Sequence, residues 1–190
     1  MRFALFIFIF ANYLLANVGS IVNYVGDVEI LRNNESIVVQ NKNYELLEND
    51  TIITKSNAKV HIVFIDNTNL TLGKNSTIKI NKYLINGANS KVDLNAKKGS
   101  YDLTSGEISK LARQSFKFQA NTATIGIRGT RFSGDLNQKF VDCNDGEIDV
   151  KVGNKTYNLK KGERLHYKNL KTIKLKKLEP SEFKMIRLGN

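Results

Sequence analysis

The stretch that decides the fold runs from Asn121 to Phe132 and reads N-T-A-T-I-G-I-R-G-T-R-F. Gly126 and Gly129 lie three residues apart in an otherwise β-prone segment, so the backbone there must turn or allow a close approach. Strand-like residues flank the segment, which places the Arg128 and Thr130 side chains at the junction of two strands. We expect Arg128 to be a buried clamp whose fork of donors ties down carbonyl groups, the alternative being an exposed ligand.

Short strands are expected on both sides of this stretch. Turn residues separate apolar runs at intervals of about eight to twelve residues, which is typical of an all-β sandwich, barrel or solenoid. Lys59 to Ile65 is the most apolar interior run, and its β-branched content favours a central strand. Residues 86–99 are polar and weakly patterned, which predicts a hairpin or a loop.

An internal echo supports the β prediction. Residues 26–30, G-D-V-E-I, recur as residues 146–150, G-E-I-D-V, and residues 42–46, K-N-Y-E-L, recur as residues 155–159, K-T-Y-N-L. We expect one three-strand unit to open and to close the domain, with its two copies packed against each other.

The central stretch resembles the signature of the FecR family, Gly-x-Arg-Gly-Thr-x-Phe, which is matched by Gly126, Arg128, Gly129, Thr130 and Phe132. The other turns and strands of that family are matched, in order, by Gly26–Ile30, Asn49-Asp50, Asp66–Thr68, Asn75-Ser76, Gly146–Val150 and Gly162-Glu163. The resemblance covers nearly all of the chain after residue 16 and implies an all-β periplasmic domain of β-solenoid or β-sandwich character. At positions 49 and 67 asparagine replaces the family glycine, and asparagine is the next best residue for left-handed backbone.

The first 16 residues have the composition of a secretory signal peptide, because a basic start is followed by an apolar run that is short for a spanning helix. We therefore predict a leader at 1–16, a FecR-like all-β domain at 17–168, and a basic edge strand with a short helix at 169–190. A leader that is retained as an anchor is the open alternative. Signalling members of the family carry a cytoplasmic segment and a membrane span before the domain, so the resemblance does not extend to sigma-factor regulation. The single cysteine, Cys143, forms no internal disulfide, and the expected periplasmic or otherwise exported location rests on the leader.

The formal charge of +11 is concentrated toward the C-terminus, where residues 151–190 hold 12 Lys and Arg against three Glu. We expect an anionic partner there, either an envelope protein or an anionic glycan or lipid. The residues expected to bind it are Lys160, Lys161, Arg164, Lys171, Lys174, Lys176 and Lys177. The alternative is a lysine-rich solvated edge that blocks strand-to-strand aggregation. Membrane contact would use the same basic edge or a retained leader, whereas nucleic acid is disfavoured by export and by the single aromatic Tyr167 among these cations.

No catalytic constellation stands out in the sequence. His61 and His166 have no ligand-pair spacing, so neither a metal nor a cofactor is expected. Asp145, Glu147 and Asp149 alternate along one strand face instead of converging on a substrate. The sequence thus predicts a non-enzymatic macromolecular binding module of the cell envelope, acting in surface signalling or in recognition of an envelope component. The alternative is a hydrolase or lyase acting on envelope polysaccharide, which would need a cleft lined by converging carboxylates.

Overall fold

The computed structural model describes residues 16–174, which fold almost entirely into β-strands. The elements are β1 (Asn17–Val25), β2 (Val28–Arg32), β3 (Glu35–Val38), β4 (Tyr44–Leu47), β5 (Thr51–Thr54), β6 (Lys59–Phe64), β7 (Asn69–Leu72), β8 (Thr77–Leu84), η1 (Gly87–Asn89), β9 (Lys91–Lys98), β10 (Ser100–Thr104), α1 (Ile108–Leu111), η2 (Arg113–Ser115), β11 (Phe116–Ala120), β12 (Ala123–Ile127), β13 (Arg131–Asp135), β14 (Phe140–Asp145), β15 (Glu147–Val152), β16 (Lys155–Lys160), β17 (Glu163–His166) and β18 (Lys171–Lys174). The all-β prediction is confirmed.

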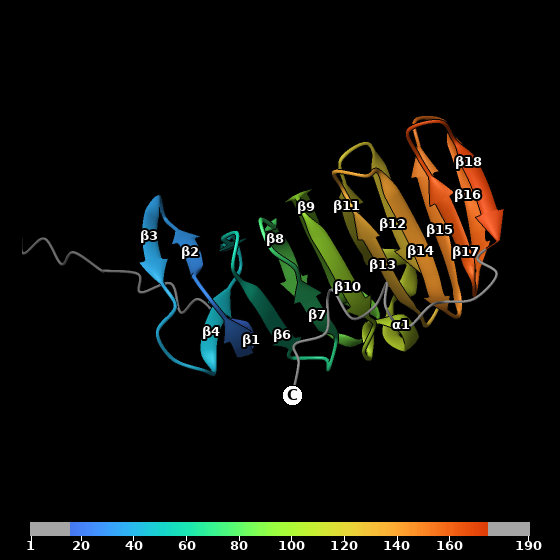
Figure 1. The fold of residues 1–190 in the computed structure, drawn as a ribbon. Coiled ribbons are helices and arrows are strands. Elements are labelled where there is room, and N and C mark those ends of the chain that lie inside the picture. Colours follow the sequence, from blue (N-terminus) through green and yellow to red (C-terminus); the bar gives the residue numbers. More distant parts are fainter. Residues whose placement is uncertain (1–15, 175–190) are drawn as a thin grey trace, which may run out of the picture.

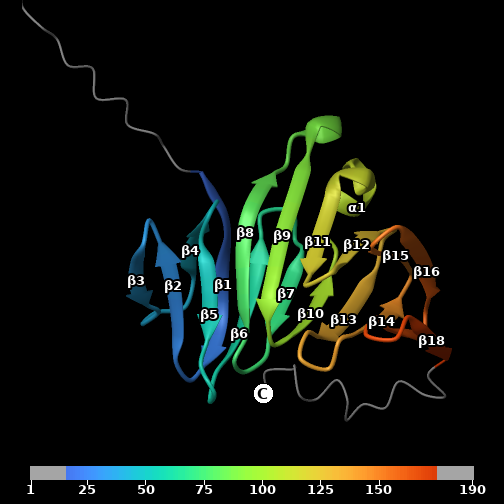
Figure 2. The ribbon, with the colours of Figure 1, turned by 90° about the horizontal axis from the view of Figure 1, so that it is seen from above.

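The strands form two open nine-stranded sheets that lie face to face (Figure 1). The first, sheet A, has the order β18-β17-β14-β13-β10-β7-β6-β1-β4, and the second, sheet B, has the order β16-β15-β12-β11-β9-β8-β5-β2-β3. As the chain advances it moves back and forth between the sheets and along their length, from the blue end to the red end in Figures 1 and 2. The result is a long sandwich with solenoid-like progression and no closed barrel.

The core lies between the sheets, and in strands such as β5, β6 and β7 buried side chains alternate with half-buried ones. In β6 the side chains of Val60, Ile62 and Phe64 are buried while those between them are half-buried, as expected for the predicted central strand. In β8, from the facing sheet, Ile78 and Ile80 are fully buried in the same way. Each such side chain contributes about 1.5–3 kcal/mol by leaving water, so the alternation fixes which face of these strands points inward.

Asparagines supply left-handed backbone where the sequence was expected to need it. Asn49 and Asn67 have φ angles of 72° and 63°, which confirms the left-handed backbone expected at these two turns, where asparagine stands in place of the family glycine.

Residues 86–99 form a hairpin arm, so the loop alternative is wrong for this stretch. After the short turn η1, β9 is a full strand that pairs with β8 on one side and, in parallel, with β11 on the other. Val92, Leu94 and Ala96 point inward and are buried, while polar residues fill the outward positions. The low mean hydropathy of this stretch therefore reflects its outward face.

The two copies of the repeated unit lie at opposite ends of the sandwich, so the expectation that they pack against each other is wrong. β2 and β3 end sheet B on one side, and β15 and β16 end it on the other. The equivalence of residues 26–30 with residues 146–150 holds, because each stretch leads from a left-handed glycine into the first strand of a hairpin. The equivalence of residues 42–46 with residues 155–159 fails, because residues 44–46 belong to β4 in sheet A whereas residues 155–159 belong to β16 in sheet B.

Three expectations concern residues or side chains outside the part of the chain that the structure describes. They are the leader at 1–16, of which only residue 16 is described, the short C-terminal helix, and the side chains at positions 174, 176 and 177. The expected edge strand is present, since β18 ends sheet A. Over residues 16–174, no helix is long and apolar enough to cross a bilayer.

Candidate functional site

The signature turn joins β12 in sheet B to β13 in sheet A and packs against a second turn. Gly126 lies within β12, and the reversal itself is at Gly129, whose φ is +72°. Gly146, also at φ +72°, begins the neighbouring turn between β14 and β15. A Cβ on Gly146 would lie within 3.0 Å of the Gly129 carbonyl oxygen and 2.9 Å from Thr130 Cγ2. The contact between the two turns therefore requires glycine at position 146, whereas glycine at position 129 is favoured by its left-handed backbone alone.

Arg128 is not a buried clamp on carbonyl groups, which corrects the expectation for this residue. Its side chain is 47% exposed and reaches across to β15, where Nη2 lies 3.1 Å from Asp149 Oδ2 and Nη1 lies 3.8 Å from Glu147 Oε2. Its main-chain N–H donates to the Glu147 carbonyl. An ion pair this exposed contributes at most about 1 kcal/mol. Arg128 thus fixes carboxylates on the surface of β15 and is not an unpartnered ligand.

Thr130 is held by Ser105 through reciprocal hydrogen bonds. The Thr130 N–H donates to Ser105 Oγ at 3.0 Å, and Ser105 Oγ donates to the Thr130 carbonyl at 3.1 Å. Phe132 then enters the core, where its ring meets those of Phe118 and Tyr101 at centroid distances of 5.3 and 6.0 Å. The signature therefore joins a surface ion pair, a tight turn and a core aromatic within seven residues.

A buried carboxylate, Asp66, anchors the neighbouring segment and was not recognised as an anchor in the sequence. Oδ1 accepts hydrogen bonds from the Thr68 N–H and the Tyr83 hydroxyl, and Oδ2 accepts from Thr68 Oγ1 and the Ile108 N–H. Burial, and then the nearby carboxylate, raises the pKa of Tyr83, so its hydroxyl stays protonated and donates. The Asp-x-Thr spacing is the local signal, because it allows the side chain to cap its own turn.

A cavity of about 390 Å³ lies between these two segments. Asp66, Glu107 and Asp145 are the carboxylates that line it. The oxygens of Asp66 already accept four hydrogen bonds, and Asp145 is paired with Lys161 at 2.8 Å. The hydrogen bond and charge of Lys161 lower the pKa of Asp145, which is the opposite of what a general acid requires.

A second groove of about 500 Å³ runs over sheet A beside the β13–β14 hairpin, and its carboxylates are also engaged. Asp142 binds Arg164 through both oxygens, and Asp135 Oδ1 accepts the N–H groups of Asn137 and Gln138. All four aspartates that line the two hollows are thus engaged by hydrogen bonds or ion pairs.

The histidines and the cysteine are placed as structural residues. His61 Nε2 lies 3.1 Å from Asn69 Oδ1, and the ring of His166 packs edge-on against Phe140. Across residues 16–174, no three His, Cys, Asp or Glu side chains gather as a metal-binding group. Cys143 is fully buried, and burial raises the pKa of its thiol to about 12.

The residues expected to bind an anionic partner divide into surface cations and one internal cation. Lys160 and Lys171 are exposed on β16 and β18, and Lys161 is 67% exposed with Asp145 as its partner. Arg164 corrects the expectation, because its side chain is only 13% exposed. It binds Asp142 bidentately from the paired strand, and its guanidinium lies 3.9 Å from the centre of the Phe140 ring. Arg164 therefore belongs to the framework and not to a binding surface.

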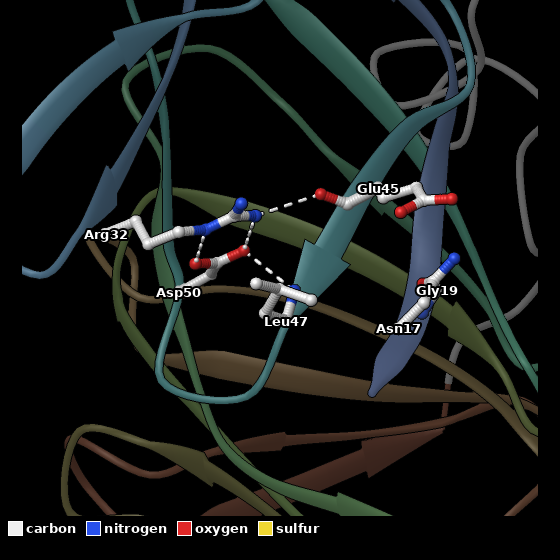
Figure 3. A network of polar contacts seen from close by, with 6 residues as sticks. All are labelled: Asn17, Gly19, Arg32, Glu45, Leu47 and Asp50. Carbon is white, nitrogen blue, oxygen red and sulfur yellow. Dashed lines mark hydrogen bonds and ion pairs between the residues drawn. The ribbon is translucent and has the colours of Figure 1, made fainter. Parts of the chain in front are cut away.

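A similar internal pair stands at the opposite end of the sandwich (Figure 3). Arg32 Nε and Nη2 donate to the two oxygens of Asp50 at 2.8 and 2.7 Å, and Nη2 also donates to the main-chain oxygen of Glu45. Asp50 further accepts the Leu47 N–H, so one network ties β2 in sheet B to β4 in sheet A. The Glu45 carboxylate points away from Arg32 in Figure 3 and is left on the surface.

The fold and the signature turn together define an all-β, two-sheet domain whose buried aspartates Asp50, Asp66 and Asp142 are held by arginines or by hydrogen bonds. A sequence model described as "FecR protein" matches residues 50–156, more than half of the chain. The chain belongs to the FecR family.

Two crystal structures of a candidate anti-sigma factor from Parabacteroides distasonis are similar to this chain. The structure at 1.65 Å resolution gives a TM-score of 0.50 at 13% identity, over 65% of this chain and 58% of that one. The structure at 2.50 Å gives a TM-score of 0.49 with the same identity and coverage. The first likeness concerns the fold, and this chain spans about 58% of the length of that protein. The search of curated proteins found no match.

Proposed function

We propose that this FecR protein is a non-enzymatic binding module of the cell envelope that recognises an anionic macromolecule through the basic end of its sandwich. The observation that carries the proposal is the density of cations at that end. Residues 147–174, which form β15 to β18, hold eight Lys and Arg against three Asp and Glu, a formal charge of +5. Residues 55–146 carry +7, but over more than three times that length.

The cations at this end are presented outward on open strands. Lys155 and Lys160 are exposed on β16, and Lys171 is exposed on β18. Among the described residues, β16 pairs with β15 and β18 pairs with β17, each on one side. An exposed strand edge offers main-chain donors and acceptors, and the lysines add long-range attraction for an anion. Recognition could thus combine main-chain pairing with charge.

The chemistry of the chain favours binding over turnover. The four aspartates that line the two hollows are engaged by hydrogen bonds or ion pairs, and Cys143 keeps its proton at neutral pH. Family membership supports a part in surface signalling, in which the partner is an envelope protein. If the chain instead recognises another envelope component, that component is an anionic glycan or lipid. The basic start and apolar run of residues 1–16 support export to the periplasm.

The test is a capture experiment with the tagged chain lacking residues 1–16, exposed to envelope extract at low and at high salt. A protein that stays bound at high salt supports a specific recognition module. Material that binds only at low salt supports an electrostatic anchor to anionic envelope, since salt screens exposed charges beyond about 10 Å at 0.1 M. Capture of nothing at either salt concentration, or turnover of envelope polysaccharide by the chain, overturns the proposal.

A further inference from the structure

Over residues 16–174, the outermost strands at the two ends of the sandwich are paired on one side only, and the two ends differ in charge. β3 and β4 are the last strands of sheets B and A at one end, which we call the acidic end, and β16 and β18 are the last strands at the other, the basic end (Figures 1 and 2). Residues 27–54, which form β2 to β5, hold six Asp and Glu against two Lys and Arg, a formal charge of −4. The basic end carries +5.

The two ends carry copies of one hairpin with different charges. β2–β3 and β15–β16 follow glycines with φ +70° and +72°, and an offset of 120 residues aligns them without a gap. At the aligned positions the pattern of exposure is the same over residues 31–40 and 151–160. Glu35 of β3 is replaced by Lys155 in β16, and Gln40 is replaced by Lys160. The same surface is therefore negative at one end and positive at the other.

Strand direction is compatible with one end stacking on the other. In sheet B, every neighbouring pair is antiparallel except β9 with β11, so β3 and β16 run in opposite directions. A second copy in the same orientation would place its β3 antiparallel to β16 and continue the ladder. In sheet A all neighbouring pairs are antiparallel, so β4 and β18 run in the same direction. They would meet as a parallel pair, an arrangement that the chain already uses between β9 and β11.

Both ends also leave apolar surface partly uncovered. At the acidic end Val38 is 58% exposed on the outer strand, and Ile37 and Tyr44 are half-buried. At the basic end Tyr157 is half-buried on β16 and packs against the core. An interface between these ends would have an apolar centre with complementary charges around it, which is the usual composition of a specific protein contact.

We propose that copies of this chain associate head to tail, with β3 and β4 of one copy docked on β16 and β18 of the next. Such a contact is heterologous, and because the two ends lie at opposite poles of the sandwich it generates an open chain of copies. The strands involved are mostly outside residues 50–156, the part matched by the family model. This inference rests on the proposed function, because it names a second copy as one partner of the basic end.

The test is sedimentation velocity of the chain lacking residues 1–16, over a range of concentrations at low salt, with charge-reversed variants. One variant carries Glu35→Lys and Glu45→Lys, one exposed residue on each outer strand of the acidic end. The other carries Lys155→Glu and Lys171→Glu, the corresponding choice at the basic end. The wild type should form species of two and more copies as concentration rises, and each variant alone should remain a monomer.

An equimolar mixture of the two variants should recover assembly, because the substituted lysines of one variant then face the substituted glutamates of the other. Without residues 1–16 the variants have formal charges of +14 and +6 compared with +10 for the wild type, so general attraction between them does not explain recovery. A matched control with Lys91→Glu and Lys97→Glu, both exposed on β9 in the middle of sheet B, should assemble like the wild type.

A wild type that stays monomeric at every concentration overturns head-to-tail association, and so does a mixture that shows no recovery. Either result leaves the proposed function standing if the wild type still captures envelope material and the Lys155→Glu, Lys171→Glu variant does not. Loss of capture by the wild type itself would count against the proposed function instead. The two failures are therefore distinguishable.

Discussion

Replacement of Gly146 by alanine tests how the signature turn is held. Gly146 and Gly129 both have left-handed backbone, and their two turns are in contact. A Cβ at position 146 would lie within 3.0 Å of the Gly129 carbonyl oxygen, a separation that real Cβ atoms essentially never show. Because the obstructing atom belongs to the backbone, one of the two turns must move.

The expected cost of Gly146→Ala has two parts. Left-handed backbone costs alanine about 1–2 kcal/mol, and the smaller entropy of the unfolded chain returns about 0.4–1 kcal/mol. Overpacking against a fixed neighbour adds about 1–3 kcal/mol. The free energy of unfolding should therefore fall by about 2–4 kcal/mol. For a chain of this size, each kcal/mol corresponds to about 2–4 °C, so Tm should fall by roughly 5–15 °C.

Gly162→Ala is the matched control for Gly146→Ala. Gly162 has φ +82°, but no atom lies within 4 Å of a Cβ built there, so only the backbone cost applies. Its free energy of unfolding should fall by about 1 kcal/mol or less. Thermal unfolding followed by circular dichroism, with urea titration for the free energies, gives both values. If Gly146→Ala were no less stable than Gly162→Ala, the contact between the two turns would not be what requires glycine at position 146.

Arg164→Ala should lower the free energy of unfolding by about 2–4 kcal/mol in urea titration, because it removes the bidentate ion-pair partner of the buried Asp142 carboxylate. Lys161→Ala should leave Tm unchanged, since its ion pair is on the surface; equal losses in the two variants would refute the distinction. Asp66→Asn should cost about 2–3 kcal/mol, because an amide group replaces an oxygen that accepts two hydrogen bonds, and an unchanged Tm would contradict that role. Cys143 should resist iodoacetamide at pH 8 in the folded chain and react in urea, because its thiol is buried and its pKa is raised to about 12. The free energy of unfolding of the wild type relative to Cys143→Ser should decline as pH rises from about 8.5 toward about 12. In that range only the unfolded thiol ionises, which favours the unfolded state.

Sequence periodicity was sufficient to predict the all-β class because many strands, including β5, β6 and β7, obey one local rule. The β6 segment alternates buried and half-buried side chains, and its β-branched residues mark it as interior. The turns at Asn49 and Asn67 were predictable for the same reason, since left-handed backbone is a property of a single residue. In β9 the inward residues are only Val92, Leu94 and Ala96, so the same rule left a weak signal there.

The arrangement of the side chains on the surface depends on pairings that the sequence does not display. Arg164 looked like one of several C-terminal cations, and only the pairing of β14 with β17 shows that Asp142 lies opposite it. Arg128 looked like a clamp for its own turn, whereas its partners come from β15, about twenty residues later. Likewise the repeat was visible at once, but the strand order that puts its copies at opposite ends follows from the whole sheet.

The most direct test of the basic end as the binding surface compares two variants of equal net charge for binding to isolated envelope. One carries Lys155→Glu and Lys171→Glu on the outer strands, and the other carries Lys91→Glu and Lys97→Glu on β9. Each has a formal charge of +7. We predict that the variant with the outer-strand substitutions loses binding and that the variant with the β9 substitutions binds like the wild type. Equal binding by the two variants would contradict it, because the position of the charges would then not matter.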